Sequence, residues 1–215
     1  MKCDKQTMRL YAVTDRAWVG RQTLYEQVES ALKGGVTCVQ LREKQLDADA
    51  FLAEARAIRD LCRRYGVPFI INDNLDVAVA CGADGVHVGQ DDLPVEEVRR
   101  RVGDAMMVGV SAHNVEEALR SQAGGADYLG AGAVFGTSTK HNVTPLSFDT
   151  LRDICGAVDI PVVAIGGIGA KNIPLLRGSG VDGVAVVSAI FSAPDITAAC
   201  RELRALSDRM TGAAE

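Results

Sequence analysis

Apolar runs of strand length recur along the chain, and most of them end in small or polar residues. Eight runs stand out, at residues 10–15, 38–42, 68–73, 85–89, 106–111, 128–134, 161–167 and 183–189. Short apolar runs bounded by turn residues are typical of buried β-strands. The pattern therefore predicts eight strands.

A short repeat precedes every second predicted strand. Each copy is a glycine followed by Val or Ala and then by Thr or Asp. The copies are Gly35-Val36-Thr37, Gly82-Ala83-Asp84, Gly125-Ala126-Asp127 and Gly180-Val181-Asp182. Because each glycine follows a helix-like segment, we expect it to adopt the left-handed conformation that ends a helix.

Helical patterns fill the gaps between the strands, with clear examples at 47–66, 94–103 and 114–125. Each opens with Asp, Pro or Asn and closes on Gly. Eight βα units in just over 200 residues predict an α/β fold, a single (β/α)8 TIM barrel that forms one domain over residues 1–215. A doubly wound open sheet is the alternative, but it usually has fewer strands, and the dinucleotide-binding version needs G-x-G-x-x-G after the first strand, which does not occur here.

The composition argues against several classes of protein. The chain has 215 residues, of which 47% are hydrophobic and 24% charged, as expected for a globular domain. A net charge of −5 and 5% aromatic residues argue against a nucleic-acid surface. No apolar run reaches the roughly 18 residues that span a bilayer, and the first residues lack the apolar core of a signal peptide, so we expect a cytoplasmic protein. A barrel with apolar outer helices can self-associate, so a homo-oligomer is compatible with the pattern.

The six cysteines are scattered and form no C-x-x-C pair. Several fall inside apolar strand or helix patterns, where a reduced thiol packs as a small hydrophobe. We expect neither a disulfide framework nor a zinc site.

The second predicted strand changes character along its length. Gln40, Arg42 and Lys44 alternate with Val39 and Leu41, so the polar side chains share one face and the aliphatic ones the other. In a (β/α)8 barrel the carboxyl ends of the strands form the active site. We therefore expect the three polar residues to face it.

Other predicted strands also end in polar groups. Arg42, Lys44 and Lys140 are three cations expected at one mouth of an acidic protein, a set suited to a multiply charged phosphate. Asp73 and Asp92 supply carboxylates on neighbouring strands, as Mg²⁺ requires. Together they suggest a diphosphate. Separately, Gly166-Gly167 and Val187-Ser188 follow strands seven and eight, where this fold commonly holds a phosphate monoester.

Purely structural roles compete with these interpretations. The polar residues of strand two could form a solvated edge, Asp73 could cap the helix that begins near Asn74, and one of Asp91 and Asp92 is expected to cap the helix that opens at Pro94. The segment GTSTK (136–140) lacks the full Walker pattern, which argues against an NTPase. For the histidines we expect a packed strand position for His87 and loop positions for His113 and His141, and we assign none of them a catalytic role.

Eight motifs follow one another along nearly the whole chain: YAVTD, QLREK, IINDN, GVHVGQDD, GVSAH, GTSTK, AIGGI and VVSAI. In this order they resemble the thiamine-phosphate synthase (thiamine-phosphate pyrophosphorylase) family. QLREK, the IND strand end, HxGQxD and TSTK together are highly specific, whereas AIGGI recurs in many phosphate-binding barrels. The chain departs from the family pattern at Ala112, where Thr is common, and over 141–148.

The resemblance implies a Mg²⁺-dependent transferase with two small-molecule substrates. It would join 4-amino-2-methyl-5-(diphosphooxymethyl)pyrimidine to a thiazole phosphate, often carried in carboxylated form, giving thiamine phosphate and diphosphate. The implied contacts to the pyrimidine diphosphate are Gln40, Leu41, Arg42, Glu43, Lys44, Asn72, Ser111 and Lys140. The implied Mg²⁺ ligands are Asp73 and Asp92. The implied contacts to the thiazole phosphate are Thr137, Ser138, Thr139, Gly167, Val187 and Ser188.

Among these residues, the implied catalytic groups are Arg42, Lys44, Ser111 and Lys140. The three cations would, together with Mg²⁺, stabilise the departing diphosphate. Three rival functions remain at this point. They are a thiazole tautomerase on the same scaffold, another phosphate-handling barrel such as a sugar-phosphate epimerase, and a non-catalytic ligand-binding regulator. The tautomerase needs neither diphosphate nor metal, so the intact QLREK, Asp73, Asp92 and Lys140 argue against it.

Overall fold

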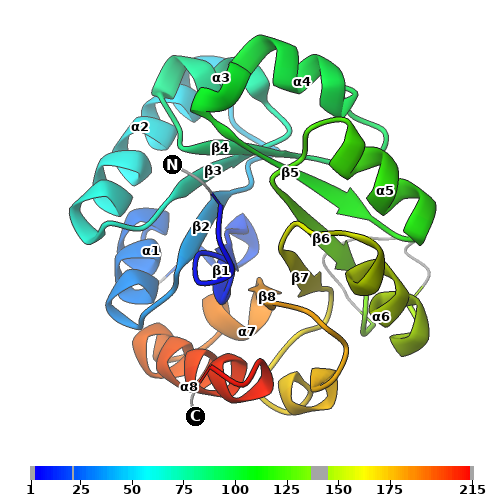
Figure 1. The fold of residues 1–215 in the computed structure, drawn as a ribbon. Helices are drawn as coiled ribbons and strands as arrows, with labels where there is room; N and C mark the ends of the chain where they lie inside the picture. The colour runs from blue at the N-terminus through cyan, green and yellow to red at the C-terminus, as the bar shows by residue number, and fades with distance from the viewer. Residues whose placement is uncertain (1–2, 21, 137–144, 214–215) are drawn as a thin grey trace.

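A computed structural model describes residues 3–20, 22–136 and 145–213 of the chain. In this part of the chain, eight parallel strands close into a barrel in chain order, with β8 paired to β1 (Figure 1). The strands are β1 (Leu10–Val13), β2 (Cys38–Leu41), β3 (Phe69–Asn72), β4 (Gly85–Val88), β5 (Met107–Ala112), β6 (Tyr128–Gly132), β7 (Val162–Ile165) and β8 (Gly183–Val186). Each lies within or overlaps one of the predicted runs, so the predicted (β/α)8 barrel is confirmed.

Helices surround the barrel and separate its strands (Figure 1). The α-helices are α1 (Leu24–Lys33), α2 (Ala48–Tyr65), α3 (Leu75–Cys81), α4 (Val95–Val102), α5 (Val115–Ala123), α6 (Phe148–Ala157), α7 (Ser188–Phe191) and α8 (Ile196–Met210). The short 3-10 helices are η1 (Arg16–Trp18), η2 (Gly103–Ala105) and η3 (Ile173–Leu176). Between β7 and β8 the chain forms only η3, with a proline in its first turn, in place of an α-helix. None of the described helices combines the length and apolar character needed to cross a membrane.

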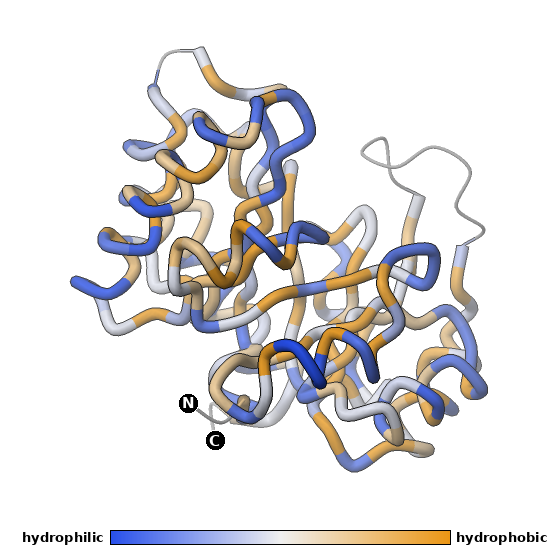
Figure 2. The backbone as a smooth tube through the Cα atoms, turned by 90° about the horizontal axis from the view of Figure 1, so that it is seen from above, coloured by the Kyte–Doolittle hydropathy of each residue, from blue (hydrophilic) through white to orange (hydrophobic). Residues whose placement is uncertain are grey.

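The strands separate two apolar cores, as their alternation predicts. Val39 and Leu41 of β2 pack outward into the large core between barrel and helices, whereas Cys38 faces the lumen. The lumen core contains Met8, Tyr11, Val13, Cys38, Ile70, Met107, Tyr128, Val163 and Ala185. Figure 2 shows apolar segments through the central strands and alternating apolar and polar segments along the helices.

The glycine repeat has a physical role at the start of the strands. All four glycines have positive φ, between 66° and 97°, as predicted. The third residue of each copy accepts a hydrogen bond from the N–H of the first or second residue of the preceding strand. For example, the N–H of Phe69 donates to Asp84 Oδ2 at 2.9 Å, and the N–H of Leu10 donates to Thr37 Oγ1 at 2.8 Å. Asp127 and Asp182 do the same for β5 and β7. The repeat therefore satisfies buried strand N–H groups at the amino-terminal end of the barrel.

Candidate active site

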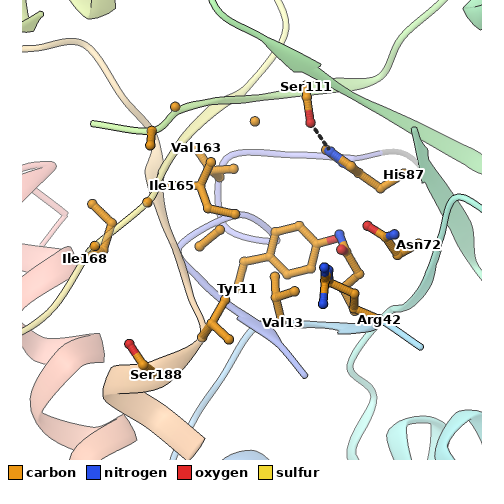
Figure 3. Close-up of a pocket in the computed structure, with 18 of the residues that line it drawn as sticks. Tyr11, Val13, Arg42, Asn72, His87, Ser111, Val163, Ile165, Ile168 and Ser188 are labelled. Carbon is orange, nitrogen blue, oxygen red and sulfur yellow. Dashed lines mark hydrogen bonds between the residues drawn. The ribbon is translucent and has the colours of Figure 1, made fainter. Parts of the chain in front are cut away.

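Two adjoining pockets open at the carboxyl ends of the strands. The lumen pocket reaches into the barrel and is lined by residues that include Tyr11, Gln40, Gly166, Gly167, Val187 and Ser188 (Figure 3). The rim pocket lies over β2, β3 and β4 and is lined by residues that include Lys44, Asp73, Gln90, Asp91 and Asp92. Both pockets share Arg42, Asn72, His87, Ser111 and His113 as lining residues. One wall therefore separates two places where a ligand can bind.

The end of β2 brings Gln40 and Arg42 to the lumen side, as the alternation predicts. Gln40 is only 4% exposed, and its Nε2 donates to Tyr11 Oη at 2.8 Å. The main-chain N–H of Arg42 donates to Thr14 Oγ1 at 3.0 Å, and its guanidinium lies 3.4 Å from a carboxylate oxygen of Asp15. Hydrogen bonds thus hold the Gln40 side chain and the Arg42 main chain in place, while Arg42 lines both pockets.

Lys44 and Asp73 meet at the rim. Their side chains form an ion pair between the loop after β2 and the end of β3. Asp73 has a φ of 61°, a conformation that few non-glycine residues adopt. The capping alternative for Asp73 is wrong, because Asn74 is the N-cap of α3 and accepts from the N–H of Val77 at 2.9 Å. The Asp73 carboxylate is therefore directed to the pocket rather than to a helix end.

The loop after β4 presents Asp92 to the same pocket. Asp92 Oδ2 accepts from the N–H of Gly89 at 2.7 Å, which folds the loop back on itself. The expectation that Asp91 or Asp92 caps the next helix is wrong, since Pro94 is the N-cap of α4 and no side chain caps it. Gln90 fixes the loop to β5 by donating to the Ser111 carbonyl at 2.6 Å.

Two residues of QLREK do not line either pocket. Leu41 is fully buried in the outer core. Glu43 is buried, and its carboxylate binds Arg16 and accepts from the N–H groups of Gln45 and Leu46. Burial acts to raise the pKa of Glu43, but these hydrogen bonds outweigh it and lower the pKa below its ordinary value. The Leu41 and Glu43 side chains therefore stabilise the strand end and the loop after it, and neither faces a pocket.

The lumen contains a polar chain that sequence patterns did not reveal. His87 Nδ1 lies 3.1 Å from Tyr128 Oη. His87 Nε2 lies 3.0 Å from Ser111 Oγ, the contact drawn as a dashed line in Figure 3. Tyr128 Oη in turn lies 2.8 Å from Tyr11 Oη. The available signal was the alternation in GVHVG, which sets His87 on the face opposite to Val86 and Val88. The structure thus gives His87 a position in both pockets.

The far side of the lumen pocket is built from glycine. Gly166 and Gly167 follow β7 with φ values of 100° and 65°. A Cβ at Gly167 would lie 2.3 Å from the carbonyl oxygen of Gly136, so only glycine fits this turn. Val187 and Ser188 come next to it at the end of β8 and the start of α7. The Gly-Gly turn and the β8 end therefore lie together, as predicted.

Thr137, Ser138, Thr139 and Lys140 lie outside the described residues. Within the described residues, no group of three or more His, Cys, Asp or Glu side chains is arranged to hold a metal ion.

A closed parallel barrel with a polar pocket at its carboxyl edge defines the class of (β/α)8-barrel enzymes. The family model described as thiamine monophosphate synthase matches residues 10–190. The chain belongs to this family.

Individual relatives agree with the family. The chain is 51% identical over 199 residues to the thiamine-phosphate synthase of Chloroflexus aurantiacus, covering 92% of both chains. It is 49% identical over 194 residues to that of Ruminiclostridium cellulolyticum, covering 90% of this chain and 92% of the relative. The solved structure of a thiamine phosphate pyrophosphorylase from Pyrococcus furiosus superposes with a TM-score of 0.87 at 38% identity, covering 96% and 98%. The chain is thus an enzyme of the transferase class.

Proposed function

We propose that the enzyme transfers the (4-amino-2-methylpyrimidin-5-yl)methyl group from its diphosphate to a thiazole phosphate, carboxylated or not, with Mg²⁺ as cofactor. The products are thiamine phosphate and diphosphate. The observation that carries this proposal is the wall shared by the two pockets, formed by Arg42, Asn72, His87 and Ser111. A transfer between two bound molecules needs adjoining subsites, and proximity of this kind contributes a large share of the rate.

The rim pocket suits the diphosphate. Arg42 offers a guanidinium fork, Lys44 an ammonium group, and Ser111 and Asn72 neutral donors. These donors line the pocket in which negative charge would develop as the diphosphate departs. Removing one such preorganised group typically costs ~10²–10³ in rate.

The carboxylates of the rim pocket fit Mg²⁺. Mg²⁺ is usually bound by one or two carboxylates together with water and substrate phosphate oxygens, and Asp73 and Asp92 line one pocket. Asp73 and Asp92 would hold the ion, which would neutralise charge on the diphosphate when bound. Asp91, exposed beside Asp92, adds to the negative potential there.

The lumen pocket suits the second substrate. The left-handed Gly166-Gly167 turn and the main chain at Val187 and Ser188 offer N–H groups to a phosphate monoester. Thr137, Ser138 and Thr139 would complete this contact and Lys140 the diphosphate contact, on the basis of the family motif.

The proposed reaction breaks one bond and forms another without a covalent enzyme intermediate. The methylene C–O bond breaks, and its electron pair leaves with the diphosphate oxygen. The aminopyrimidine ring spreads the positive charge that remains, and the thiazole nitrogen lone pair then forms the new C–N bond. The enzyme's tasks are to stabilise the departing charge and to align the two substrates.

Mixing the two substrates with and without Mg²⁺ tests the proposal. We expect thiamine phosphate and diphosphate to form in equal amounts and only with the metal. Isomerisation of the thiazole phosphate alone would instead indicate a tautomerase. Binding without any product would indicate a ligand-binding regulator.

A further inference from the structure

Five polar side chains form one continuous hydrogen-bond chain across the barrel lumen. In order they are Gln40, Tyr11, Tyr128, His87 and Ser111, with successive separations of 2.8, 2.8, 3.1 and 3.0 Å. They come from β2, β1, β6, β4 and β5, so the chain joins opposite sides of the barrel. Gln40 and Ser111, the two ends, both line the lumen pocket.

The hydrogen-bond chain has a direction, because each group in it donates to the next. Gln40 Nε2 can only donate, so Tyr11 Oη accepts from it and donates its own proton to Tyr128 Oη. Tyr128 then donates to His87 Nδ1, and in a neutral imidazole the other nitrogen, Nε2, carries the proton and donates to Ser111 Oγ. The Ser111 proton is left to donate to a ligand. The opposite direction requires the Gln40 amide to be turned round and Ser111 to donate to His87.

A diphosphate ligand selects between these two directions. Its oxygens can only accept, so Ser111 must donate to it, and every other proton in the chain then follows. At the far end, Gln40 Nε2 is committed to Tyr11, and Gln40 Oε1 remains as an acceptor for a ligand. An amino group on the pyrimidine is a donor that matches this acceptor.

We propose that Tyr11, Tyr128 and His87 are positioning residues, which make Ser111 a donor to the diphosphate and Gln40 an acceptor for the pyrimidine amino group. The inference rests on the proposed function and extends it to substrate selection. When a diphosphate oxygen accepts a hydrogen bond from Ser111, Gln40 on the other side of the barrel lumen presents an acceptor. The ligand group at Gln40 must then be a donor.

The surroundings keep the chain in place. Tyr11 and Tyr128 are 1% and 0% exposed, so bulk solvent has little access to their hydroxyl groups. Burial raises the pKa of both tyrosines far above the ordinary value, so both remain proton donors. A Cβ at Gly109 would lie 2.1 Å from the Tyr128 ring, and one at Gly130 would lie 3.2 Å from the His87 ring. Glycine on β5 and β6 thus leaves the space in which this chain fits.

The test compares two ligands by calorimetry, each with Mg²⁺ and without thiazole phosphate. One is the aminopyrimidine diphosphate, and the other is its analogue with a carbonyl oxygen in place of the amino group. We expect the wild type to bind the amino compound at least about tenfold more tightly than the carbonyl analogue. The amino group can donate to Gln40 Oε1, whereas the analogue leaves this buried acceptor without a hydrogen bond. Tyr128→Phe keeps the ring and breaks the chain, which frees the Gln40 amide to turn, so this preference should fall toward one.

Controls separate this role from a general loss of structure. Tyr65→Phe changes a tyrosine that is 38% exposed at the end of α2 and should keep the wild-type preference. An unchanged preference in Tyr128→Phe, or an equal loss of affinity for both ligands, overturns the inference. If the wild type makes no product from the two natural substrates, the proposed function fails instead.

A second measurement determines the tautomer of His87 while Tyr128 is unchanged, so it does not depend on the folding of Tyr128→Phe. Nitrogen NMR of labelled histidine reports which ring nitrogen carries the proton, and the chain has three histidines, so His113→Asn and His141→Asn assign the signals. With Mg²⁺ and inorganic diphosphate bound, we expect His87 to be protonated at Nε2 alone. Protonation at Nδ1, alone or together with Nε2, overturns the inference.

Discussion

The Lys44 ammonium and the Asp73 carboxylate form an ion pair at the carboxyl edge of the barrel, between the ends of β2 and β3. The pair joins a group suited to bind diphosphate with a group suited to bind Mg²⁺. Diphosphate would compete with Asp73 for Lys44, and Mg²⁺ would compete with Lys44 for Asp73. This relationship leads to two separate predictions.

Asp73→Asn should weaken Mg²⁺ binding. The substitution keeps the shape of the side chain but removes the charge that attracts the ion, and we expect the dissociation constant for Mg²⁺ to rise at least about tenfold, or ~1.4 kcal/mol. Calorimetric titration of Mg²⁺ in the presence of inorganic diphosphate measures it. Asp104→Asn, on the exposed η2 connection, is the matched control. An unchanged titration in Asp73→Asn would remove this residue from the metal site.

Lys44→Gln should have the opposite effect on the metal. Without the competing ammonium group, Mg²⁺ alone should bind Asp73 about two- to fivefold more tightly, the effect of a partly exposed pair worth ~0.5–1 kcal/mol. Inorganic diphosphate should bind more weakly in the same variant. Weaker Mg²⁺ binding in the absence of diphosphate would contradict a competition between the two.

Glu43→Gln should destabilise the fold in a pH-dependent way. Glu43 binds Arg16 and two main-chain N–H groups, and its pKa is lowered in the folded state. A lowered folded pKa gives stability that is present above the unfolded value and is lost as pH falls through the folded value. We expect a loss of about 2 kcal/mol at pH 7 that shrinks in acid.

Urea unfolding of Glu43→Gln and wild type from about pH 7 down to about pH 3, below the ordinary pKa of a glutamate, measures this difference. Glu97→Gln, at a half-exposed side chain on α4, serves as the control and should change stability little. A destabilisation of equal size at every pH would mean that the Glu43 charge has no part in it.

Asp84→Ala should destabilise the barrel at its amino-terminal end. The change removes the acceptor for the N–H of Phe69 at the start of β3. One lost hydrogen bond to a charged acceptor costs about 1.5–3 kcal/mol, which corresponds to a fall in melting temperature of roughly 3–12 °C for a chain of this size. Thermal unfolding measures this change, with Asp104→Ala as the control. Equal melting temperatures for Asp84→Ala and wild type would show that the third residue of the repeat does not stabilise the barrel.

Most of the fold could be predicted because its signals are local. The strand runs, the helix ends and the positive φ at Gly35, Gly82, Gly125 and Gly180 each depend on a few neighbouring residues. The exception is the segment between β7 and β8, where Pro174 accompanies a short 3-10 helix.

The site could be predicted only in part, because it depends on contacts between distant segments. Alternation correctly set Gln40 and Arg42 on the lumen side. The partners of Tyr11 and Tyr128 are set by barrel closure, which brings together residues 117 positions apart. Likewise, Asp92 bonds to Gly89 instead of a helix end, a choice that sequence spacing alone does not reveal.

Single-turnover kinetics of Arg42→Ala test most directly whether cations at this rim stabilise the departing diphosphate. We predict that the rate of diphosphate release falls ~10²–10³-fold while the affinity for thiazole phosphate falls far less, because the guanidinium acts mainly on charge that develops during bond cleavage. Arg100→Ala, 73% exposed on α4, should behave as wild type. A release rate unchanged in Arg42→Ala, or reduced only as far as thiazole phosphate binding is reduced, would contradict this mechanism.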